Sequence, residues 1–272
     1  MIHFFAEPLS FGFFVRAMLA AMAASAACAT VGTFLILRGM TFLGDAIAHA
    51  ILPGVAIGYL VHRGERSAVF YWALGTAVVT SLAVGAIGKR GRLKEDTAIG
   101  IVFAGMFALG IGLISTARGY AVDLMHFLFG NVLAVSPQDL WLILGLCGGV
   151  ILVVLALWKE LALATFDPLF ARTLRLPVDA IRYLILVLTA ITVVTALRVV
   201  GVALALAMLV TPPATGYLLA KRLPGMVGIA LAAGVLSGFW GLYLSYYLGM
   251  APGAAVVLVA TGLFLLALPF RR

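Results

Sequence analysis

The sequence predicts an all-α, polytopic transmembrane helical bundle of about eight or nine spans. The first reason is composition: 64% of the 272 residues are hydrophobic and 10% are charged, whereas about a quarter of the residues in soluble domains are charged. The second reason is length, because apolar stretches of roughly 20 residues recur along the chain, and a helix needs that length to cross the hydrocarbon core. Lipid must therefore surround most of this protein.

The apolar stretches define nine candidate spans. They cover about 12–37, 44–62, 68–88, 97–117, 138–157, 181–197, 201–220, 226–248 and 253–269. Only three residues separate the sixth span from the seventh, so these two form a tight hairpin or one of them is a half-span. The first span lacks a following cleavage-site pattern, which argues against a signal peptide. We expect residues 1–272 to form one transmembrane domain, with a cytoplasmic segment at about 158–180.

The basic residues predict topology rather than nucleic-acid binding. The formal net charge is +8, but the lysines and arginines stand in short loops between apolar spans. If the 88–96 loop is cytoplasmic, most of the 18 lysine and arginine residues fall on the cytoplasmic side, as the positive-inside rule requires. The amino terminus is then external and the carboxyl terminus cytoplasmic, in a multi-pass protein of the cytoplasmic membrane.

Local signals predict how the helices begin and pack. Ser136 before Pro137 and Asp167 before Pro168 are N-cap and first-turn pairs. Glycines four residues apart let membrane helices approach closely. Such pairs occur at Gly54/Gly58, Gly145/Gly149 and Gly234/Gly238, and the cysteines Cys28 and Cys147 lie in spans where packing is their expected role.

Asp45 and His49 form the candidate metal-binding pair. They stand four residues apart at the start of the second span, which puts them on one helical face with their Cβ atoms about 5–6 Å apart. A carboxylate within a bilayer costs on the order of 3 kcal/mol unless it is paired or faces a polar cavity. Carboxylate and imidazole together suit a divalent transition metal, and two subunits would supply four ligands. The alternative is a structural role, in which the two side chains bond to each other or Asp45 caps the helix.

Prolines within spans mark a candidate transport pathway. Pro53 follows the metal-binding pair and is expected to kink its helix, which frees backbone carbonyls. Thr211, Pro212 and Pro213 lie in the middle of the seventh span. Two adjacent prolines remove two backbone donors, so we expect this helix to bend or unwind.

A short cytoplasmic helix carries a candidate docking surface. Its apolar stripe consists of Phe166, Leu169, Phe170 and Leu174, beside the Asp167–Pro168 cap. This stripe fits the groove of a partner protein, or the helix lies on the membrane surface. The external segment 119–135 contains Asp123, His126 and Asn131, which line an outer vestibule or belong to a solvated loop.

The residues 37–54 (LRGMTFLGDAIAHAILPG) closely resemble the most characteristic stretch of the ABC-3 family of metal-uptake permeases. The similarity continues through 95–101 (EDTAIGI), 128–131 (LFGN), 166–168 (FDP) and 200–204 (VGVAL) to Pro212. The order and spacing of these stretches hold along nearly the whole chain. Three departures are Ala48, where the family often has serine, the additional Pro213, and His126, which lies outside the family pattern.

The resemblance implies an importer permease that works as a homodimer, binds two ATPase subunits and receives its ion from an extracytoplasmic metal-binding protein. Asp45 and His49 match positions that contact the ion, and the segment from Phe166 matches the coupling helix that docks on the ATPase. No permanently bound cofactor is expected. Zn²⁺ is the expected substrate, with Mn²⁺ or Fe²⁺ as the alternative.

The sequence also bears on other classes of function. It contains no GxxxxGK[ST], HExxH or GxSxG pattern, so we expect a transport permease without enzymatic activity, with ATP hydrolysis in a separate subunit. A secondary transporter driven by ion gradients is the main rival, and the scarcity of further intramembrane carboxylates argues against it. A permease for cobalamin or siderophores would need a wider pathway, and a non-transporting scaffold would not need Asp45.

Overall fold

The computed structural model describes residues 7–62, 66–90, 94–116 and 135–270. Every regular element within these ranges is a helix. The helices, with their bounds, are α2 (Gly12–Leu37), α3 (Leu43–Ala50), α4 (Leu52–His62), α5 (Arg66–Arg90), α6 (Glu95–Thr116), α8 (Pro137–Ala156), α9 (Trp158–Phe166), α10 (Pro168–Thr173), α11 (Val178–Val200), α12 (Val202–Leu219), α13 (Leu223–Leu248), α14 (Pro252–Ala267) and the 3₁₀ turn η2 (Leu268–Phe270).

The helices confirm the predicted transmembrane bundle. Eight stretches within the described ranges are long and apolar enough to cross a membrane, and α3 and α4 together form one of them. The remaining candidate span, the seventh at 201–220, corresponds to α12, whose apolar part, Leu204–Leu219, is shorter. Gly201 alone separates α11 from α12 and has a φ of 80°. Because this φ favours glycine, the tight turn between the two helices depends on it.

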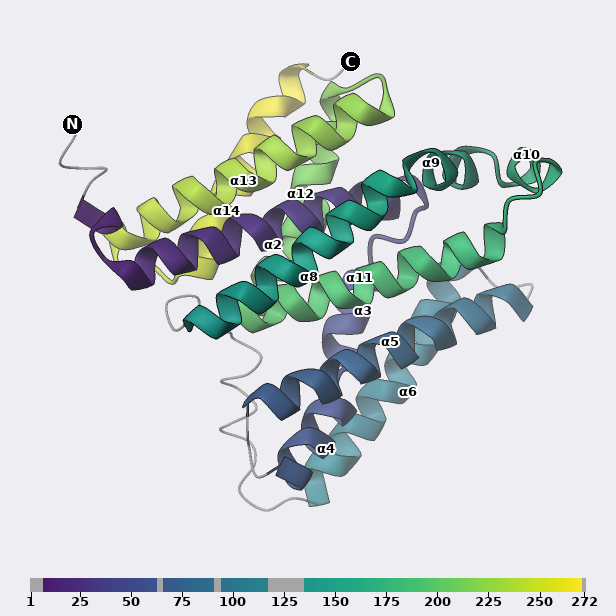
Figure 1. The fold of residues 1–272 in the computed structure, drawn as a ribbon, viewed down its shortest axis with the longest axis horizontal. Coiled ribbons are helices and arrows are strands. Elements are labelled where there is room, and N and C mark those ends of the chain that lie inside the picture. Colours follow the sequence, from purple (N-terminus) through teal and green to yellow (C-terminus); the bar gives the residue numbers. More distant parts are fainter. Residues whose placement is uncertain (1–6, 63–65, 91–93, 117–134, 271–272) are drawn as a thin grey trace.

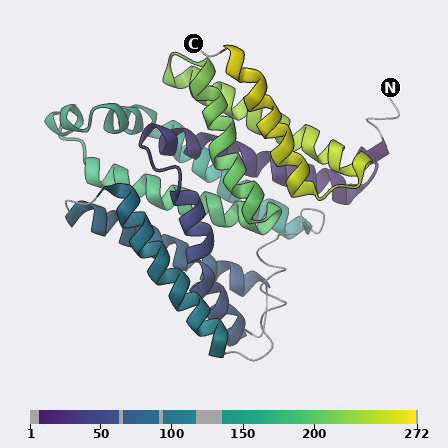
Figure 2. The ribbon, with the colours of Figure 1, turned by 180° about the vertical axis from the view of Figure 1, so that it is seen from behind.

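Helix α2 lies at the centre of one group of helices, against α8, α11, α12 and α13 (Figure 1). Helices α4, α5 and α6 pack together as a second group, seen below the first in Figure 1 and from behind in Figure 2. Helix α11 joins the groups because it packs on both α2 and α5. The short helix α3 contacts α6, α5, α11 and α12, so it stands where the two groups meet.

The predicted helix starts are confirmed. The Ser136 hydroxyl accepts a hydrogen bond from the Asp139 backbone N–H, and the Asp139 carboxylate accepts one from the Ser136 N–H. The Asp167 carboxylate accepts a hydrogen bond of 2.8 Å from the Phe170 N–H at the start of α10. These side chains satisfy backbone donors that have no partner within the helix.

The glycine pairs divide into two kinds. A Cβ at Gly54 would lie 2.5 Å from the Trp72 carbonyl oxygen, and one at Gly234 would lie 3.1 Å from the Ser25 carbonyl oxygen. These glycines do permit close helix contacts. By contrast, no heavy atom of the described residues lies within 4 Å of a Cβ built on Gly145 or Gly149. The expectation of close packing fails for that pair within one chain, because both glycines are on an uncovered face of α8.

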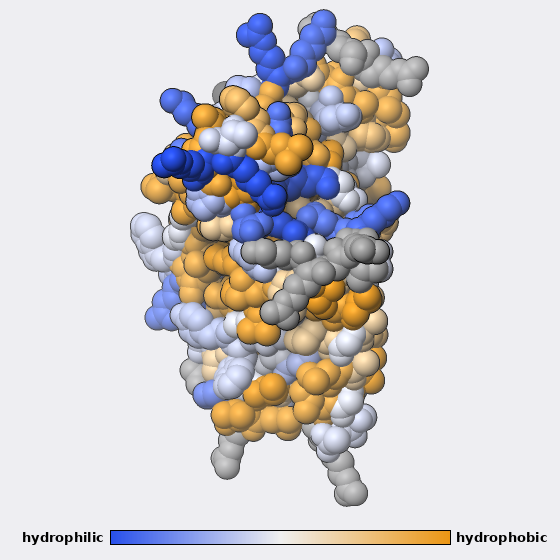
Figure 3. Space-filling view, turned by 90° about the vertical axis from the view of Figure 1, so that its right-hand side faces the viewer, coloured by the Kyte–Doolittle hydropathy of each residue, from blue (hydrophilic) through white to orange (hydrophobic). Residues whose placement is uncertain are grey.

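Hydrophilic side chains gather on the side of the protein that faces the viewer in Figure 3, which includes the end of the bundle where α2 finishes and α11 begins. We call this end of the bundle the basic end. In the described part of the chain it carries Arg38, Lys94, Lys159, Arg172, Arg175, Arg182, Lys221 and Arg222. The arrangement fits the cytoplasmic side that the positive-inside rule predicts. The opposite end carries Arg16 and Arg198, and the Arg198 guanidinium pairs there with the Asp139 carboxylate.

The two proline sites differ from each other. The second span is broken at Ile51 into α3 and α4, two residues before Pro53, as the predicted kink requires. Helix α12 instead runs unbroken from Val202 to Leu219 with Pro212 and Pro213 inside it, so the expected unwinding is not found. Both prolines are buried, and the neighbouring helices hold α12 in shape although two backbone donors are missing.

Candidate metal-binding site

Helix α3 places Asp45 and His49 on its one uncovered face. The side chains between and beside them point into the protein, since Ala46 is 7% exposed and Ile47 and Ala48 are fully buried. The side chain of Asp45 is 50% exposed and that of His49 is 35% exposed. Asp45 also stands in the first turn of α3, where the helix dipole favours a negative charge.

The two side chains lie close together without a short hydrogen bond. His49 Nε2 is 3.5 Å from Asp45 Oδ1, which is longer than the usual 2.7–3.2 Å of an N–H···O hydrogen bond. Two ligand atoms that each lie about 2.1 Å from one ion, at angles between square and tetrahedral, are about 3.0–3.4 Å apart. The observed separation is therefore close to the spacing of two ligands on one cation.

Two phenylalanines of α6 surround the imidazole on its covered side. The ring centroids of Phe103 and Phe107 lie 6.3 and 6.0 Å from that of His49, at interplanar angles of 61° and 90°. These contacts restrict the ring, while 35% of the His49 side chain stays exposed. Neither aromatic was among the predicted site residues, although their spacing of four residues on one helix was a signal for a common face.

One chain supplies only part of a metal site. No group of three or more His, Cys, Asp or Glu side chains that could hold an ion occurs in residues 7–62, 66–90, 94–116 and 135–270. A divalent ion in a protein site normally has four to six ligands. The predicted vestibule residues Asp123, His126 and Asn131 lie outside the described residues.

Helix α12 supports α3 from behind. A Cβ at Gly44 would lie 2.3 Å from Leu209 Cδ2, so the Leu209 side chain packs directly on the residue before Asp45. The Leu209 carbonyl oxygen would be 1.9 Å from a Cβ at Gly32 in α2. This carbonyl has no helical donor, because residue 213 is proline. Leu209 therefore joins α12 to both α2 and α3.

The predicted pathway residues Thr211 and Pro53 lie in different helices. Thr211 is half-buried in α12, two residues from Leu209, and its carbonyl accepts a hydrogen bond from the Thr215 hydroxyl. Pro53 packs against α6, where a Cβ at Gly110 would lie 3.1 Å from Pro53 Cδ. Since Pro53 is buried in this contact, it acts on the helix path rather than through an exposed side chain.

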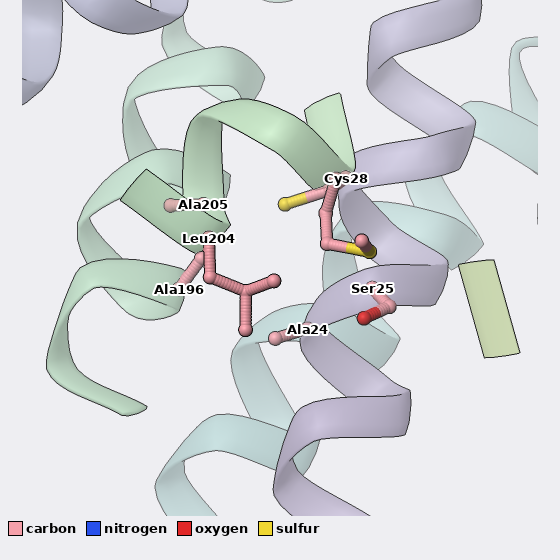
Figure 4. Close-up of a pocket in the computed structure, with 7 residues that line it drawn as sticks. Ala24, Ser25, Cys28, Ala196, Leu204 and Ala205 are labelled. Atoms are coloured by element: carbon pink, nitrogen blue, oxygen red, sulfur yellow. The ribbon is translucent and has the colours of Figure 1, made fainter. Parts of the chain in front are cut away.

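A small cavity lies elsewhere in the bundle, between α2, α11 and α12 (Figure 4). Its empty space is about 150 Å³ when open solvent is included, without room for a water molecule, and its wall includes Ser25 and Cys28 of α2 facing Leu204 and Ala205 of α12. Neither Asp45 nor His49 is part of this wall. Cys28 and Cys147 are both buried and free, in agreement with their predicted place in the packing.

The predicted docking segment projects from the basic end (Figure 1). It comprises α9 and α10, and its large apolar side chains are uncovered: Phe166 is 64% exposed, Leu169 74%, Phe170 51% and Leu174 54%. The Asp167 cap and Pro168 set the direction of α10. The stripe is thus available to another protein or to the membrane surface.

The comparison with known families decides the identity of this fold. The sequence pattern of the ABC 3 transport family matches residues 10–271. The chain belongs to this family. It is therefore a membrane permease of the metal-uptake kind and not an enzyme, since ATP hydrolysis in such transporters takes place in a separate subunit.

Curated relatives support the same assignment over almost the full length. The manganese transport system membrane protein MntC of Halalkalibacterium halodurans is 47% identical over 98% of this chain and 90% of its own length. The manganese import system permease protein ScaB of Streptococcus parasanguinis is 39% identical over 94% and 90%, respectively. A probable iron transport system membrane protein of Haemophilus influenzae is 36% identical over 100% and 98%.

Solved structures confirm the fold. A chain of PsaBC from Streptococcus pneumoniae, solved in complex with Fab, superposes with a TM-score of 0.83 at 36% identity, and the match covers 98% of this chain and 95% of that one. An inward-facing putative metal-chelate type ABC transporter gives a TM-score of 0.75 at 15% identity, over 94% and 85%. The second likeness concerns the fold alone.

Proposed function

We propose that this permease imports Mn²⁺ across the bacterial cytoplasmic membrane, in place of the Zn²⁺ that the sequence analysis favoured. The strongest support is the 47% identity with a manganese permease over nearly the whole chain. The pair Asp45 and His49 is compatible with this ion, since carboxylates suit manganese and imidazole suits several divalent metals. Fe²⁺ is the second candidate, because one of the relatives is a probable iron permease.

The metal site would form between two copies of the chain. One copy has two ligands 3.5 Å apart on a face that its own helices leave uncovered. A carboxylate on such a face would cost on the order of 3 kcal/mol or more against lipid, and this cost disappears if the face meets a second copy across a polar pathway. A homodimer related by a two-fold axis would bring two carboxylates and two imidazoles to one ion.

The energy for transport would come from a separate ABC ATPase. The apolar stripe of the docking segment, Phe166 to Leu174, would lie in a groove of that subunit at the basic end. An extracytoplasmic binding protein would deliver the ion at the opposite end. Helix α3 and helix α12 would line the route between the two ends, with Thr211 near the contact of Leu209 with Gly44.

Uptake by liposomes tests this function. The chain is reconstituted with its ATPase and its binding protein, and the accumulation of radioactive Mn²⁺, Fe²⁺ and Zn²⁺ is measured with and without internal or external ATP. We expect ATP-dependent uptake of Mn²⁺ above that of Zn²⁺. Preferred uptake of Zn²⁺ would overturn the substrate assignment, and metal uptake by the chain alone along an ion gradient would favour a secondary transporter.

A further inference from the structure

Three of the sequence stretches that carry the family resemblance meet at one corner of the basic end. Arg38 caps the end of α2, Glu95 begins α6, and Phe166 ends α9. These positions are far apart in the sequence, yet the end of α2 lies beside α9 in both ribbon views (Figures 1 and 2). Metal binding and ATPase docking account for Asp45 and Phe166 but leave Arg38 without a role.

Arg38 fastens the end of α2 to the docking segment. Its Nε donates a hydrogen bond of 3.2 Å to the Thr165 hydroxyl, across 127 positions of sequence. The Thr165 hydroxyl in turn donates a hydrogen bond of 2.7 Å to the Leu161 carbonyl of the same helix. Thr165 immediately precedes the exposed apolar stripe, so this hydrogen bond is made at the base of the surface that would meet the ATPase.

The turn after Arg38 is held by successive backbone hydrogen bonds. The Arg38 N–H donates to the Phe34 carbonyl at 3.1 Å and the Met40 N–H to the Leu35 carbonyl at 2.9 Å. The Leu43 N–H then donates to the Met40 carbonyl at 3.1 Å, where α3 begins. Met40 is also buried, with 1% of its surface exposed, so a short, hydrogen-bonded turn connects Arg38 to the start of α3.

The surroundings of Arg38 disfavour the positive charge of its guanidinium. Burial lowers the pKa of Arg38, the nearby Glu95 carboxylate raises it, and Arg182 lowers it again. Glu95 is itself paired with Arg182, with 3.0 Å between Oε1 and Nη2. The Nη2 atom of Arg38 is buried without a partner among the described atoms, which disfavours a purely stabilising role for this side chain.

We propose that Arg38 is a positioning residue that transmits the movement of the docking segment to the metal-binding helix α3 through its hydrogen bond to Thr165. This inference rests on the proposed function. A second contact supports the same joint, because the rings of Phe34 and Trp158 meet edge to face with 6.0 Å between their centroids. A coupling element of this kind needs a discrete contact that both sites bias, and the hydrogen bond between Arg38 and Thr165 is the contact to which we assign this role.

The test uses the reconstituted complex of permease, ATPase and binding protein. Thr165→Val keeps the shape of the side chain and removes its hydroxyl, and Thr165→Ser retains the hydroxyl. The measured quantities are the Mn²⁺ ions transported per ATP hydrolysed and the amount of ATPase bound. For Thr165→Val we expect a ratio at least about fivefold lower with normal ATPase binding, and for Thr165→Ser a ratio near that of the wild type.

Arg38→Gln provides the other half of the pair, and Arg222→Gln is the control because Arg222 is exposed at the same end. The double variant Arg38→Gln, Thr165→Val should lose no more than the stronger single variant. The proposal would be overturned if the fold reductions in this ratio from the two single variants multiplied in the double variant. An unchanged ratio in Thr165→Val, or loss of ATPase binding in that variant, would overturn it as well. If the wild-type complex shows no ATP-dependent uptake, the proposed function fails instead.

Discussion

The side chain of Leu209 in α12 packs against Gly44 in α3, directly before Asp45. A Cβ at Gly44 would lie 2.3 Å from Leu209 Cδ2, and Leu209 is 1% exposed. The position of the carboxylate thus depends on the surface of another helix and not on α3 alone. This relationship makes the candidate metal-binding pair sensitive to changes that leave both Asp45 and His49 in place.

Gly44→Ala should lower transport while Asp45 and His49 are retained. The added methyl must displace the buried Leu209 side chain or shift α3, and overpacking of this kind costs about 1–3 kcal/mol. Thermal unfolding in detergent and Mn²⁺ uptake check the two effects. Gly262→Ala is the control, because no atom in the described part of the chain contacts the added methyl within 4 Å. Unchanged uptake in Gly44→Ala would show that α12 does not position the pair.

Pro213→Ala should stabilise the isolated permease and reduce its transport. The alanine N–H supplies a helical donor to the Leu209 carbonyl, and proline inside a helix costs about 3 kcal/mol relative to alanine. Because Pro213 Cγ packs near Gly32, part of this gain is lost with that contact. A higher unfolding temperature with lower Mn²⁺ uptake would support a role of the prolines in the movement of the transport pathway. A higher unfolding temperature with full uptake would show that the prolines serve only helix packing.

Much of the fold could be predicted from the sequence because membrane helices are encoded locally. Ser136 and Asp167 mark helix starts, and the pair Asp45 and His49 shares a face by spacing alone. Contacts between distant segments were not predictable in this way. The hydrogen bond of Arg38 with Thr165 and the packing of Leu209 on Gly44 depend on how the helices assemble, and no local pattern encodes that assembly.

The unbroken course of α12 also depends on its contacts with other helices. Its two prolines remove backbone donors, which favoured a bend or an unwound turn when the helix was considered alone, and no unwound turn is found. In the assembled protein Gly32 lets the Leu209 carbonyl approach α2 closely. The neighbouring helices then determine the shape of α12 more strongly than its own sequence.

Asp139→Asn should destabilise the end of the bundle opposite the basic end. The Arg198 guanidinium pairs with Asp139 and also lies over the Phe70 ring, with 4.7 Å between Cζ and the ring centroid. Loss of the carboxylate leaves the largely buried Arg198 cation without its partner. Because the pair is not fully buried, the cost is about 2 kcal/mol, below that of a fully buried pair. Arg172→Gln is the comparison, because its pair with Asp179 is exposed at 3.8 Å and should contribute less than about 1 kcal/mol. Equal losses in unfolding free energy would contradict this ranking.

Phe170→Asp should prevent the ATPase from binding while the permease folds normally. Phe170 is 51% exposed on the docking segment, so a charge there does not disturb the core but opposes burial in an apolar groove. Co-purification of the two subunits measures the effect, and Phe170→Leu should retain binding. A complex of normal stability with the aspartate variant would remove the docking role from α10.

The central claim is that one Mn²⁺ ion is held by Asp45 and His49 from two copies of the chain. Electron paramagnetic resonance of Mn²⁺ bound to the purified transporter tests it directly, since the imidazole nitrogen couples to the electron spin of the ion. We predict one bound ion per two chains, nitrogen coupling that disappears in His49→Gln, and loss of binding in Asp45→Ala although that protein still inserts into the membrane. Mn²⁺ bound with unchanged nitrogen coupling in His49→Gln, together with full binding by Asp45→Ala, would contradict the account.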